Sequence, residues 1–280
     1  MRTDNKNEIK KILDLLHKVR GYDFTGCSMP MLNRRIEKRI FATKTDSFNS
    51  YLKFLQITPE EFDALVDVLT INVSKFFRNP IYFEYLFKII IPLIVSKKLK
   101  NNDSYIRIWS AGCAAGEEPY SIAINIYEYL EKEIEKFNIS IFATDIDENS
   151  LAIARKGKYN FDSIEEVKTG ILKKYFTCTK DGYIINSKIK EMIDFSFFDL
   201  LDKKKSVPPE SIFGGFDIVL CRNVLIYFNT DYHKIIFGKI AKALNPGGYL
   251  ILGEAEVISE EFKSKFKKDS RCCKIYRKIG

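Results

Sequence analysis

Hydrophobic residues in the first part of the chain recur at the three- and four-residue spacing of an amphipathic helix. The first run consists of Ile9, Ile12, Leu13, Leu16 and Val19. Gly21 follows this run, in the position that favours the end of a helix. In a second run Ser28 is a candidate N-cap, and Leu32, Ile36 and Ile40 lie four residues apart on one face. The pattern therefore predicts two helices, each with one apolar face.

A third helix signal follows at Thr58-Pro59-Glu60-Glu61, which has the form of a capping box with proline at the first helical position. It predicts a helix that runs through Leu69. Because only helical patterns precede it, residues 1–70 are predicted to form a small helical domain.

After about residue 100 the pattern changes to an alternation of short apolar strands and helices. We expect strands over 105–109, 139–144, 216–221, 249–253 and 272–276, the last at an edge, helices over 119–135, 148–156 and 232–244, and a turn over 246–248. Strands separated by helices indicate βαβ units and a mostly parallel sheet with helices on both faces. The fold class is therefore α/β with a doubly wound, Rossmann-like sheet. Residues 71–280 form this second domain, and 71–100 connect it to the first.

The alternation of strand and helix patterns is interrupted over about 175–193. Two short strand patterns flank Asp181-Gly182, which predicts a small antiparallel β-hairpin inserted in the sheet domain. Residues 192–198 either add a third strand to the hairpin or return to the main sheet. A decorative insertion and a partner-binding subdomain both fit this pattern.

Composition narrows the function classes. The apolar share of 46% and the charged share of 29% are typical of a folded globular protein. The longest apolar run, 89–95, is too short for a membrane span, and residues 1–11 do not resemble a secretory signal, so we expect a cytoplasmic protein without membrane insertion. The six cysteines form no C-x-x-C pair and the chain has two histidines, so we expect no metal site. The net charge of +8 favours an acidic partner.

Polar residues gather where the predicted parallel strands end, which is where doubly wound sheets bind ligands. The first strand is followed by Gly112 and Gly116, spaced as in neither a P-loop nor a dinucleotide-binding fingerprint. The second is followed by Asp145 and Asp147. We predict that Asp145 accepts hydrogen bonds from a ribose diol and that Asp147 caps the next helix.

Two further segments complete the pattern. The strand over 216–221 leads into Cys221-Arg-Asn-Val-Leu-Ile-Tyr-Phe228, and Asn72-Val-Ser-Lys-Phe-Phe-Arg78 joins the two predicted domains. These segments, with Trp109-Ser-Ala-Gly-Cys-Ala-Ala-Gly-Glu-Glu-Pro-Tyr-Ser121 and Phe142-Ala-Thr-Asp-Ile-Asp147, resemble the CheR-type glutamate methyltransferases of chemoreceptors. The resemblance covers nearly the whole chain, in the right order.

The resemblance implies a class I methyltransferase that uses S-adenosyl-L-methionine and releases S-adenosyl-L-homocysteine. It implies methyl transfer to glutamate carboxylates on the cytoplasmic helical bundle of methyl-accepting chemoreceptors, by a monomer that binds no nucleic acid. It assigns the methyl-transfer site to Arg78 and Tyr227. It assigns cofactor contacts to Asn72, Ser74, Arg78, Gly112, Glu118, Asp145, Asp199, Leu200, Arg222 and Asn223. It assigns receptor docking to Arg34, Arg35, Lys38 and Arg39.

The chain departs from the family pattern in two places. Gly253-Glu-Ala-Glu256 stands where the family commonly has Gly-His-Ser-Glu, and the Asp199 position is asparagine in some relatives. The hairpin is too short to be assigned to the members that bind a receptor tail. The chemistry suits a chain with few histidines, because a glutamate carboxylate with a pKa of about 4.3 is already ionised at neutral pH and needs no general base.

Three alternatives remain open at this stage. A class I methyltransferase acting on RNA or a small molecule would use the basic helical domain as a clamp, although the chain lacks the Asn/Asp-Pro-Pro-Tyr/Phe motif of amino-group methylases. A non-catalytic S-adenosylmethionine-binding scaffold would have no evident need for both Arg78 and Tyr227. A nicotinamide-dependent dehydrogenase would need the glycine fingerprint that is missing here.

Overall fold

The computed structural model describes residues 5–70, 74–211 and 215–280. Contacts divide the chain into two compact units. The helical unit comprises the described part of Met1–Asn72 together with Leu225–His233, and the sheet unit comprises the described parts of Val73–Val224 and Lys234–Gly280. A short segment from late in the sequence thus belongs to the unit formed by the first helices.

The helical unit contains α1 (Lys6–Arg20), α2 (Met29–Ala42), α3 (Phe48–Ile57), α4 (Glu61–Leu69) and the turn η5 (Leu225–Tyr227). Gly21 ends α1 with a φ of 79°, as predicted, because a left-handed residue there costs glycine little. Ser28 is at the N-cap of α2, although its side chain makes no capping bond. Apolar residues of the four helices, among them Ile12, Ile36 and Leu65, pack into one core.

The predicted capping box at Thr58 is wrong. Thr58 ends α3, and α4 begins at Glu61 with Glu60 at its N-cap. The Glu61 carboxylate does not reach back to the start of its helix, because it accepts hydrogen bonds from Arg39 and Tyr51. Tertiary partners have therefore replaced the local cap.

The sheet unit is built on a seven-stranded sheet in the order β6-β2-β1-β7-β8-β10-β9. Its strands are β1 (Tyr105–Ala111), β2 (Asn138–Asp145), β6 (Ile193–Phe197), β7 (Phe216–Cys221), β8 (Leu244–Leu252), β9 (Phe266–Lys268) and β10 (Ile275–Lys278). The pairs among β6, β2, β1, β7 and β8 are parallel, and β10 runs antiparallel to both neighbours. Because the order reverses at β1, right-handed crossovers place α7 and α11 on opposite faces of the sheet.

The helices and short turns of this unit are α5 (Pro80–Tyr85), the π-helical turn η1 (Leu86–Ile90), α6 (Ile91–Lys100), α7 (Glu117–Leu130), η2 (Glu131–Lys136), α8 (Glu148–Lys156), η3 (Asp162–Ile164), α9 (Thr169–Tyr175), α10 (Ser187–Lys190), η4 (Pro209–Ser211), α11 (Thr230–Ala243) and η6 (Glu260–Lys265). The first residues of α11 belong to the helical unit. The doubly wound α/β fold is confirmed. No helix in the described ranges is long and apolar enough to cross a membrane.

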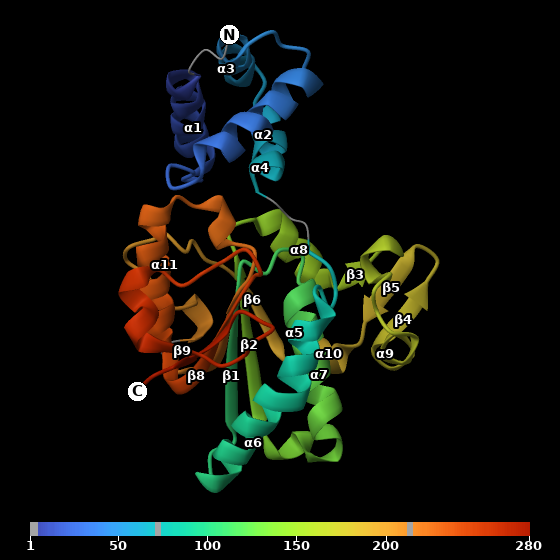
Figure 1. Ribbon diagram of the computed structural model, residues 1–280. Helices are drawn as coiled ribbons and strands as arrows, with labels where there is room; N and C mark the ends of the chain where they lie inside the picture. Colours follow the sequence, from blue (N-terminus) through green and yellow to red (C-terminus); the bar gives the residue numbers. More distant parts are fainter. Residues whose placement is uncertain (1–4, 71–73, 212–214) are drawn as a thin grey trace. The chain divides into compact units, whose positions relative to one another are not determined.

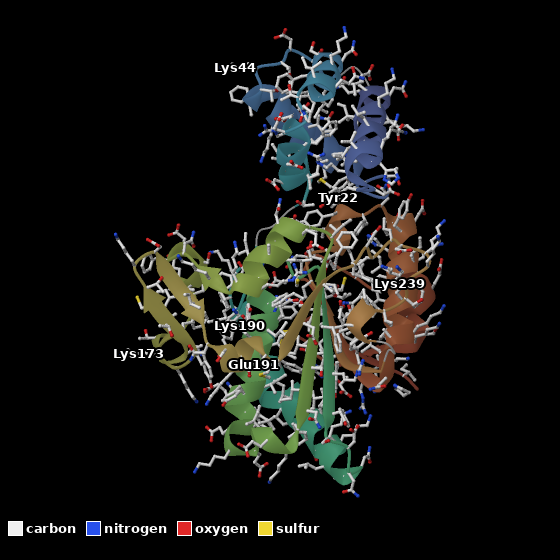
Figure 2. The ribbon with its side chains drawn as sticks, turned by 180° about the vertical axis from the view of Figure 1, so that it is seen from behind. Tyr22, Lys44, Lys173, Lys190, Glu191 and Lys239 are labelled. Atoms are coloured by element: carbon white, nitrogen blue, oxygen red, sulfur yellow. The ribbon has the colours of Figure 1, made fainter. Side chains whose placement is uncertain are left out.

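A separate three-stranded antiparallel sheet stands beside the main one (Figure 1) and consists of β3 (Lys158–Tyr159), β5 (Gly182–Ile185) and β4 (Phe176–Thr179). The predicted hairpin is confirmed as β4 and β5, and β3 is an addition that the sequence pattern missed. The alternative for residues 192–198 is also settled, because β6 pairs with β2 of the main sheet. Lys173 and Lys190 lie on this side of the unit (Figure 2).

Three other element boundaries differ from the prediction. The helix expected over 119–135 ends at Leu130, where a 3-10 turn begins. The turn expected over 246–248 is a bulge inside β8: Phe216 pairs with Leu244 and Ile218 with Tyr249, which leaves extra residues between the two partners in β8. The last strand begins at Ile275, and β9 rather than β10 forms the edge of the sheet.

Candidate active site

Three loops leave the sheet at the carboxyl ends of β1, β2 and β7. Because β1 pairs with both β2 and β7, these loops start side by side at the point where the strand order reverses. The backbone N–H groups of Gly112 and Cys113 donate to the carbonyl oxygen of Thr144 at 2.8 and 3.0 Å. The first loop is thus anchored directly to the end of β2, at the ligand-binding edge of a doubly wound sheet.

Two glycines shape the first loop. Gly112 has a φ of 75°, and a Cβ there would lie 2.4 Å from Cγ2 of Val224 in the third loop. Gly116 has a φ of 93°, and its Cβ would lie 2.9 Å from Cβ of Ala154. Any other residue at Gly112 would be strained and would also push the first loop away from the third. Glycine is therefore required at both positions for close packing against neighbouring side chains.

Asp145 ties the first loop to the second. Its Oδ2 accepts a hydrogen bond from the backbone N–H of Ala114 at 2.8 Å, and its Oδ1 accepts one from Asp147 at 3.0 Å. Burial raises the pKa of the Asp145 carboxyl above its ordinary value. The side chain keeps partial exposure, and each carboxylate oxygen has a further lone pair. The geometry suits an acceptor for two hydroxyl groups.

Asp147 has a different role. Its carboxylate is buried and accepts hydrogen bonds from the backbone N–H groups of Asn149 and Ser150 and from the Ser150 hydroxyl. The prediction that Asp147 caps α8 is confirmed. Of these two aspartates, Asp147 therefore caps a helix, and Asp145 leaves its carboxylate at the candidate site.

Glu118 and Arg222 form an ion pair below the loops. Arg222 Nη1 lies 3.0 Å from Glu118 Oε2, and the Ser110 hydroxyl donates to Glu118 Oε1 at 2.9 Å. The Arg222 side chain is 2% exposed and that of Glu118 13%. Residues from β1, α7 and the third loop therefore meet in one nearly dry cluster.

The same guanidinium also holds the segment that enters the sheet unit. Nη2 of Arg222 donates to the carbonyl oxygen of Arg78 at 2.9 Å and to Oδ1 of Asn79 at 3.1 Å. Its plane lies over the rings of Tyr82 and Phe83, 4.8 and 5.5 Å from their centroids. These contacts make Arg222 a positioning residue for the Arg78 segment, which sequence reasoning had described only as a cofactor contact.

The segment that carries Arg78 is anchored along its length. The Ser74 hydroxyl hydrogen-bonds to the Glu117 carboxylate, and the backbone N–H of Phe77 donates to Oγ of Ser121 at 2.9 Å. Phe77 and Asn79 have φ values of 53° and 60°, which are uncommon for non-glycine residues. The Gly-Glu-Glu-Pro-Tyr-Ser string therefore organises this neighbouring segment as well as starting α7. Asn72 lies outside the described residues, so its predicted cofactor contact stays a prediction.

Glu256 organises the third loop from the end of β8. Its Oε2 accepts hydrogen bonds from the backbone N–H groups of Asn223 and Gly253, and its Oε1 accepts one from Val224. Asn223 has a φ of 59° within this arrangement. From the sequence alone, 253–256 is only a departure from the family pattern, and Glu256 has no assigned role.

Glu254 belongs to the same string, in which the chain departs from the family pattern. Its Oε1 accepts a hydrogen bond from Nδ2 of Asn79 at 3.0 Å, on the segment that Arg222 also holds. The Asn79 side chain therefore forms hydrogen bonds with both Arg222 and Glu254. The signal that could have found these residues was the unusual string itself, but a contact across 175 residues is not visible in a linear pattern.

Asp199 and Leu200 follow β6, the strand beside β2. Oδ1 of Asp199 accepts a hydrogen bond from the backbone N–H of Leu201 at 2.8 Å, and Leu200 is buried. The backbone N–H of Phe198 donates to the carbonyl oxygen of Asp145, which brings this turn to the second loop. Lys239 of α11 (Figure 2) packs over the Phe198 ring, and burial lowers the pKa of its ammonium group.

Tyr227 belongs to the helical unit. Its carbonyl oxygen accepts a hydrogen bond from the backbone N–H of Ser28 at 2.8 Å, and Cys27 forms an isolated antiparallel bridge with Phe228. Arg78 lies in the sheet unit, so the predicted meeting of its guanidinium with the Tyr227 phenol remains a prediction.

The basic cluster on α2 divides into two pairs. Arg39 makes two hydrogen bonds of 2.8 Å to the Glu61 carboxylate, and Arg35 donates to the carbonyl oxygen of Val68. Arg34 and Lys38 are exposed. Half of the predicted docking cluster is therefore engaged within the helical unit, and the other half faces solvent.

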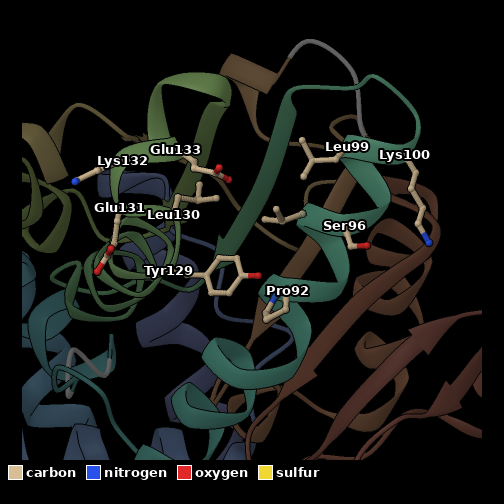
Figure 3. A pocket seen from close by; sticks show the side chains of 10 residues that line it. Pro92, Ser96, Leu99, Lys100, Tyr129, Leu130, Glu131, Lys132 and Glu133 are labelled. Atoms are coloured by element: carbon tan, nitrogen blue, oxygen red, sulfur yellow. The ribbon is translucent and has the colours of Figure 1, made fainter.

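A cavity away from these loops lies between α6 and the end of α7 (Figure 3). Pro92, Ser96 and Leu99 line it from α6, and Tyr129 faces them from α7. These elements lead into the first residues of β1 and β2, at the opposite end of the strands from the glycine loop. This cavity is therefore not part of the candidate site.

The chain matches two family models. Residues 7–70 match the all-alpha domain of CheR methyltransferases, and residues 72–273 match their S-adenosylmethionine-binding domain. Together these matches cover most of the sequence. The predicted cofactor and the methyltransferase class are confirmed.

Curated relatives agree with the family models. A chemotaxis protein methyltransferase of Borreliella burgdorferi is 30% identical over 256 residues, which make up 90% of this chain and 89% of the relative. Chemotaxis protein methyltransferase 2 of Vibrio cholerae is 32% identical over 249 residues, covering 88% and 84% of the two chains. A chemotaxis protein methyltransferase of Listeria innocua is 33% identical and covers 85% of each chain. The chain described here belongs to the CheR methyltransferase family.

Proposed function

We propose that the protein transfers the methyl group of S-adenosyl-L-methionine to glutamate side-chain carboxylates of chemoreceptors, in the cytoplasm and as part of chemotaxis. The products are glutamate methyl esters and S-adenosyl-L-homocysteine. The observation that carries the proposal is the partly exposed Asp145 carboxylate, fixed between two loops at the switch point of the sheet. The chemotaxis methyltransferases to which the chain is similar support the choice of acceptor.

The residues at this edge fit the cofactor. Asp145 offers acceptors to the two hydroxyls of a ribose, and Gly112 lets the first loop pack closely against Val224 of the third loop, which fixes the two loops beside each other. Glu118, Asp199, Leu200 and Asn223 surround the same edge, on elements that their backbone bonds hold in place. When bound, S-adenosylmethionine supplies an activated methyl group on a sulfonium.

The protein's own contribution is alignment rather than proton transfer. A glutamate carboxylate is ionised at neutral pH, so the site needs no general base. Holding the acceptor oxygen in line with the methyl group converts an encounter between two molecules into a step within one complex, and orientation of this kind can supply a large part of the acceleration. We assign this work to the Arg78 guanidinium and the Tyr227 phenol.

Arg78 is suited to a positioning role because its backbone is fixed on two sides. The Arg222 guanidinium binds its carbonyl oxygen, and Glu254 and Arg222 both bind the next residue, Asn79. A cation on a rigid segment loses little entropy when it binds a carboxylate. Ser74, four residues earlier, completes the anchoring of the segment on α7.

For receptor docking we propose the exposed pair Arg34 and Lys38 on α2. Arg35 and Arg39, which the family resemblance also assigns to docking, support α2 from within the helical unit. An acidic helical surface on the receptor would complement this basic face and speed the encounter.

Methyl-labelled S-adenosylmethionine and receptor-bearing membranes test the reaction. We expect label on the receptor that alkali releases as methanol, because an ester is labile to base. Label that survives alkali, or that appears on RNA instead, would exclude a glutamate ester.

Asp145→Ala tests the cofactor site separately by calorimetry. We expect S-adenosylmethionine affinity to fall at least about tenfold, through loss of two charge-assisted hydrogen bonds. Unfolding free energy should change little, because removing a partly desolvated carboxylate offsets the lost backbone bonds. Asp181→Ala, an exposed aspartate in the β4–β5 turn, is the matched control. Unchanged affinity in Asp145→Ala would remove the ribose role.

A further inference from the structure

Two adjacent cysteines lie just before β10, with their sulfur atoms 3.5 Å apart. Cys272 is exposed and Cys273 is buried. The Ser270 hydroxyl lies 3.3 Å from Sγ of Cys272 and accepts a hydrogen bond from the backbone N–H of Cys273 at 3.1 Å. The pair is therefore held in one tight turn, with one thiol open to solvent and the other directly beneath it.

No other cysteine of the chain shares this arrangement. Cys27, Cys113 and Cys221 are buried, and burial raises the pKa of the latter two well above the ordinary value. Cys178 is exposed on β4, and its thiol donates a hydrogen bond to the backbone carbonyl oxygen of Thr179. Only the 272–273 pair combines an accessible thiol with a second thiol in contact.

The two thiols differ in acidity. Hydrogen bonds from Ser270 and Cys273, together with the charge of Lys268, lower the pKa of Cys272. Burial and the neighbouring sulfur raise the pKa of Cys273 to about 11. Because the thiolate is the reactive form, an oxidant meets an activated sulfur at Cys272 first.

Hydrogen bonds of the Lys274 backbone connect the turn to the candidate active site. The backbone N–H of Lys274 donates to the Tyr82 hydroxyl at 3.2 Å, and the Tyr82 ring lies under the Arg222 guanidinium. On its other side, the carbonyl oxygen of Lys274 accepts a hydrogen bond from the backbone N–H of Leu252 at 3.0 Å. Leu252 directly precedes Gly253, which binds Glu256. We therefore expect a shift of Lys274 to displace Arg222, which holds the Arg78 segment, and Glu256, which holds the third loop.

We propose that Cys272 and Cys273 form a reversible redox site at which a peroxide produces a disulfide that slows the enzyme. The Cys272 thiolate attacks one oxygen of hydrogen peroxide, the O–O bond breaks, and a sulfenic acid and hydroxide form. The Cys273 thiol then attacks the sulfur of the sulfenic acid, an S–S bond forms, and water leaves. In sum, one thiolate and one thiol lose two electrons to one peroxide, which becomes one hydroxide and one water, and the hydroxide takes up the proton that Cys272 released on ionising.

The bond is readily reversed because its geometry is strained. Adjacent Cα atoms are about 3.8 Å apart, below the usual disulfide range of about 4.4 to 6.8 Å. The sulfur atoms must also approach from 3.5 Å to about 2.05 Å, which requires the backbone of the turn to move. Strained disulfides are the more easily reduced ones, so a small dithiol restores the starting state.

The first experiment detects the bond itself. The full-length protein is treated with hydrogen peroxide, and the chymotryptic peptide spanning 267–276 is examined by mass spectrometry. We expect this peptide to lose two hydrogens and to regain them with dithiothreitol. If Cys178 is oxidised while the 272–273 peptide remains reduced, the proposal is wrong. This readout does not depend on the identity of the methyl acceptor.

The second experiment measures the consequence. Oxidation should lower the methylation rate roughly tenfold, because small displacements of positioning groups are costly, and dithiothreitol should restore it. Cys272→Ser should keep the basal rate and lose the sensitivity to peroxide, whereas Cys178→Ser should remain as sensitive as the parent. Calorimetry with S-adenosylhomocysteine reports the same displacement without an acceptor. A disulfide that forms without changing either rate or affinity would overturn the regulatory role.

Discussion

Two largely buried arginine–glutamate clusters among the described residues look alike but hold different elements together. In the helical unit Arg39 pairs with Glu61, which also accepts a hydrogen bond from the Tyr51 hydroxyl at 2.7 Å. In the sheet unit Arg222 pairs with Glu118, which also accepts one from the Ser110 hydroxyl. Each cluster thus consists of a guanidinium, a carboxylate and a hydroxyl group.

The two clusters differ in which groups the N–H donors of each arginine bind. Arg39 uses Nε and Nη2 on the two oxygens of one carboxylate, a closed bidentate pair. Arg222 gives one nitrogen to Glu118 and another to the Arg78 segment, and its buried Nε has no hydrogen-bond partner among the described residues. The first cluster joins one helix to another, whereas the second joins the Arg78 segment to the sheet. Identical residue types therefore do not reveal which elements an ion pair holds together.

The largest effect is expected for Arg222→Met. It leaves Glu118 buried without its cation, which costs about 3 to 5 kcal/mol of unfolding free energy. It also frees the Arg78 segment, so the methylation rate should fall more than about a hundredfold even where the protein is fully folded. Denaturant unfolding and steady-state kinetics measure the two effects, and a rate that follows only the folded fraction would contradict the positioning role.

A smaller effect is expected for Glu118→Gln. The amide keeps the shape and an oxygen for Ser110 but removes the negative charge opposite Arg222. We expect a roughly tenfold loss in rate or cofactor affinity, with a loss of about 1 to 2 kcal/mol in stability. Glu61→Gln is the matched change in the other cluster. If both variants lose activity equally, the proposed contrast between the clusters fails.

Arg39→Met should affect stability alone. The side chain of Arg39 is 20% exposed and that of Glu61 is 7% exposed, so the lost pair is worth about 2 kcal/mol after allowance for solvent screening. Thermal unfolding should occur earlier, while turnover per folded molecule and cofactor affinity stay at the parental level. Receptor affinity should fall further in Arg34→Ala than in Arg39→Met, which pull-down with receptor membranes can measure.

The smallest effects separate the two hydroxyl groups. Tyr51→Phe and Ser110→Ala each remove one hydrogen bond to a carboxylate, at a cost of about 1 kcal/mol. Only Ser110→Ala should also weaken S-adenosylmethionine binding, because Ser110 supports Glu118 at the end of β1. Equal calorimetric affinities for the two variants would show that Glu118 does not depend on this support.

Much of the fold could be predicted because its signals are local. Asp147 is predictable as a helix cap because its partners lie two and three residues along the chain, and Gly21 is predictable as a helix end because glycine adopts the left-handed conformation at little cost. The strands that meet at the glycine loop followed from the period of the apolar residues. The family strings then placed the cofactor loops in the right order.

The rest depended on contacts that no local pattern contains. Glu61 had the sequence of a helix cap, yet a partner 22 residues away binds its carboxylate. Glu256 and Glu254 reach across 33 and 175 residues to the groups they hold. The bulge in β8 lies between Leu244 and Tyr249, whose partners Phe216 and Ile218 in β7 are only two residues apart. Each miss is a case in which tertiary partners outweighed a local preference.

The segment Leu225–His233 belongs to the helical unit, although both of its chain neighbours belong to the sheet unit. The chain enters and leaves this segment from the sheet unit, yet its backbone is bonded to Gly26 and Ser28. Any rigid displacement of the helical unit, for example on docking to a partner, must therefore drag the Tyr227 backbone with it. We therefore expect a force applied to the helical unit to be transmitted to the Tyr227 backbone through these hydrogen bonds.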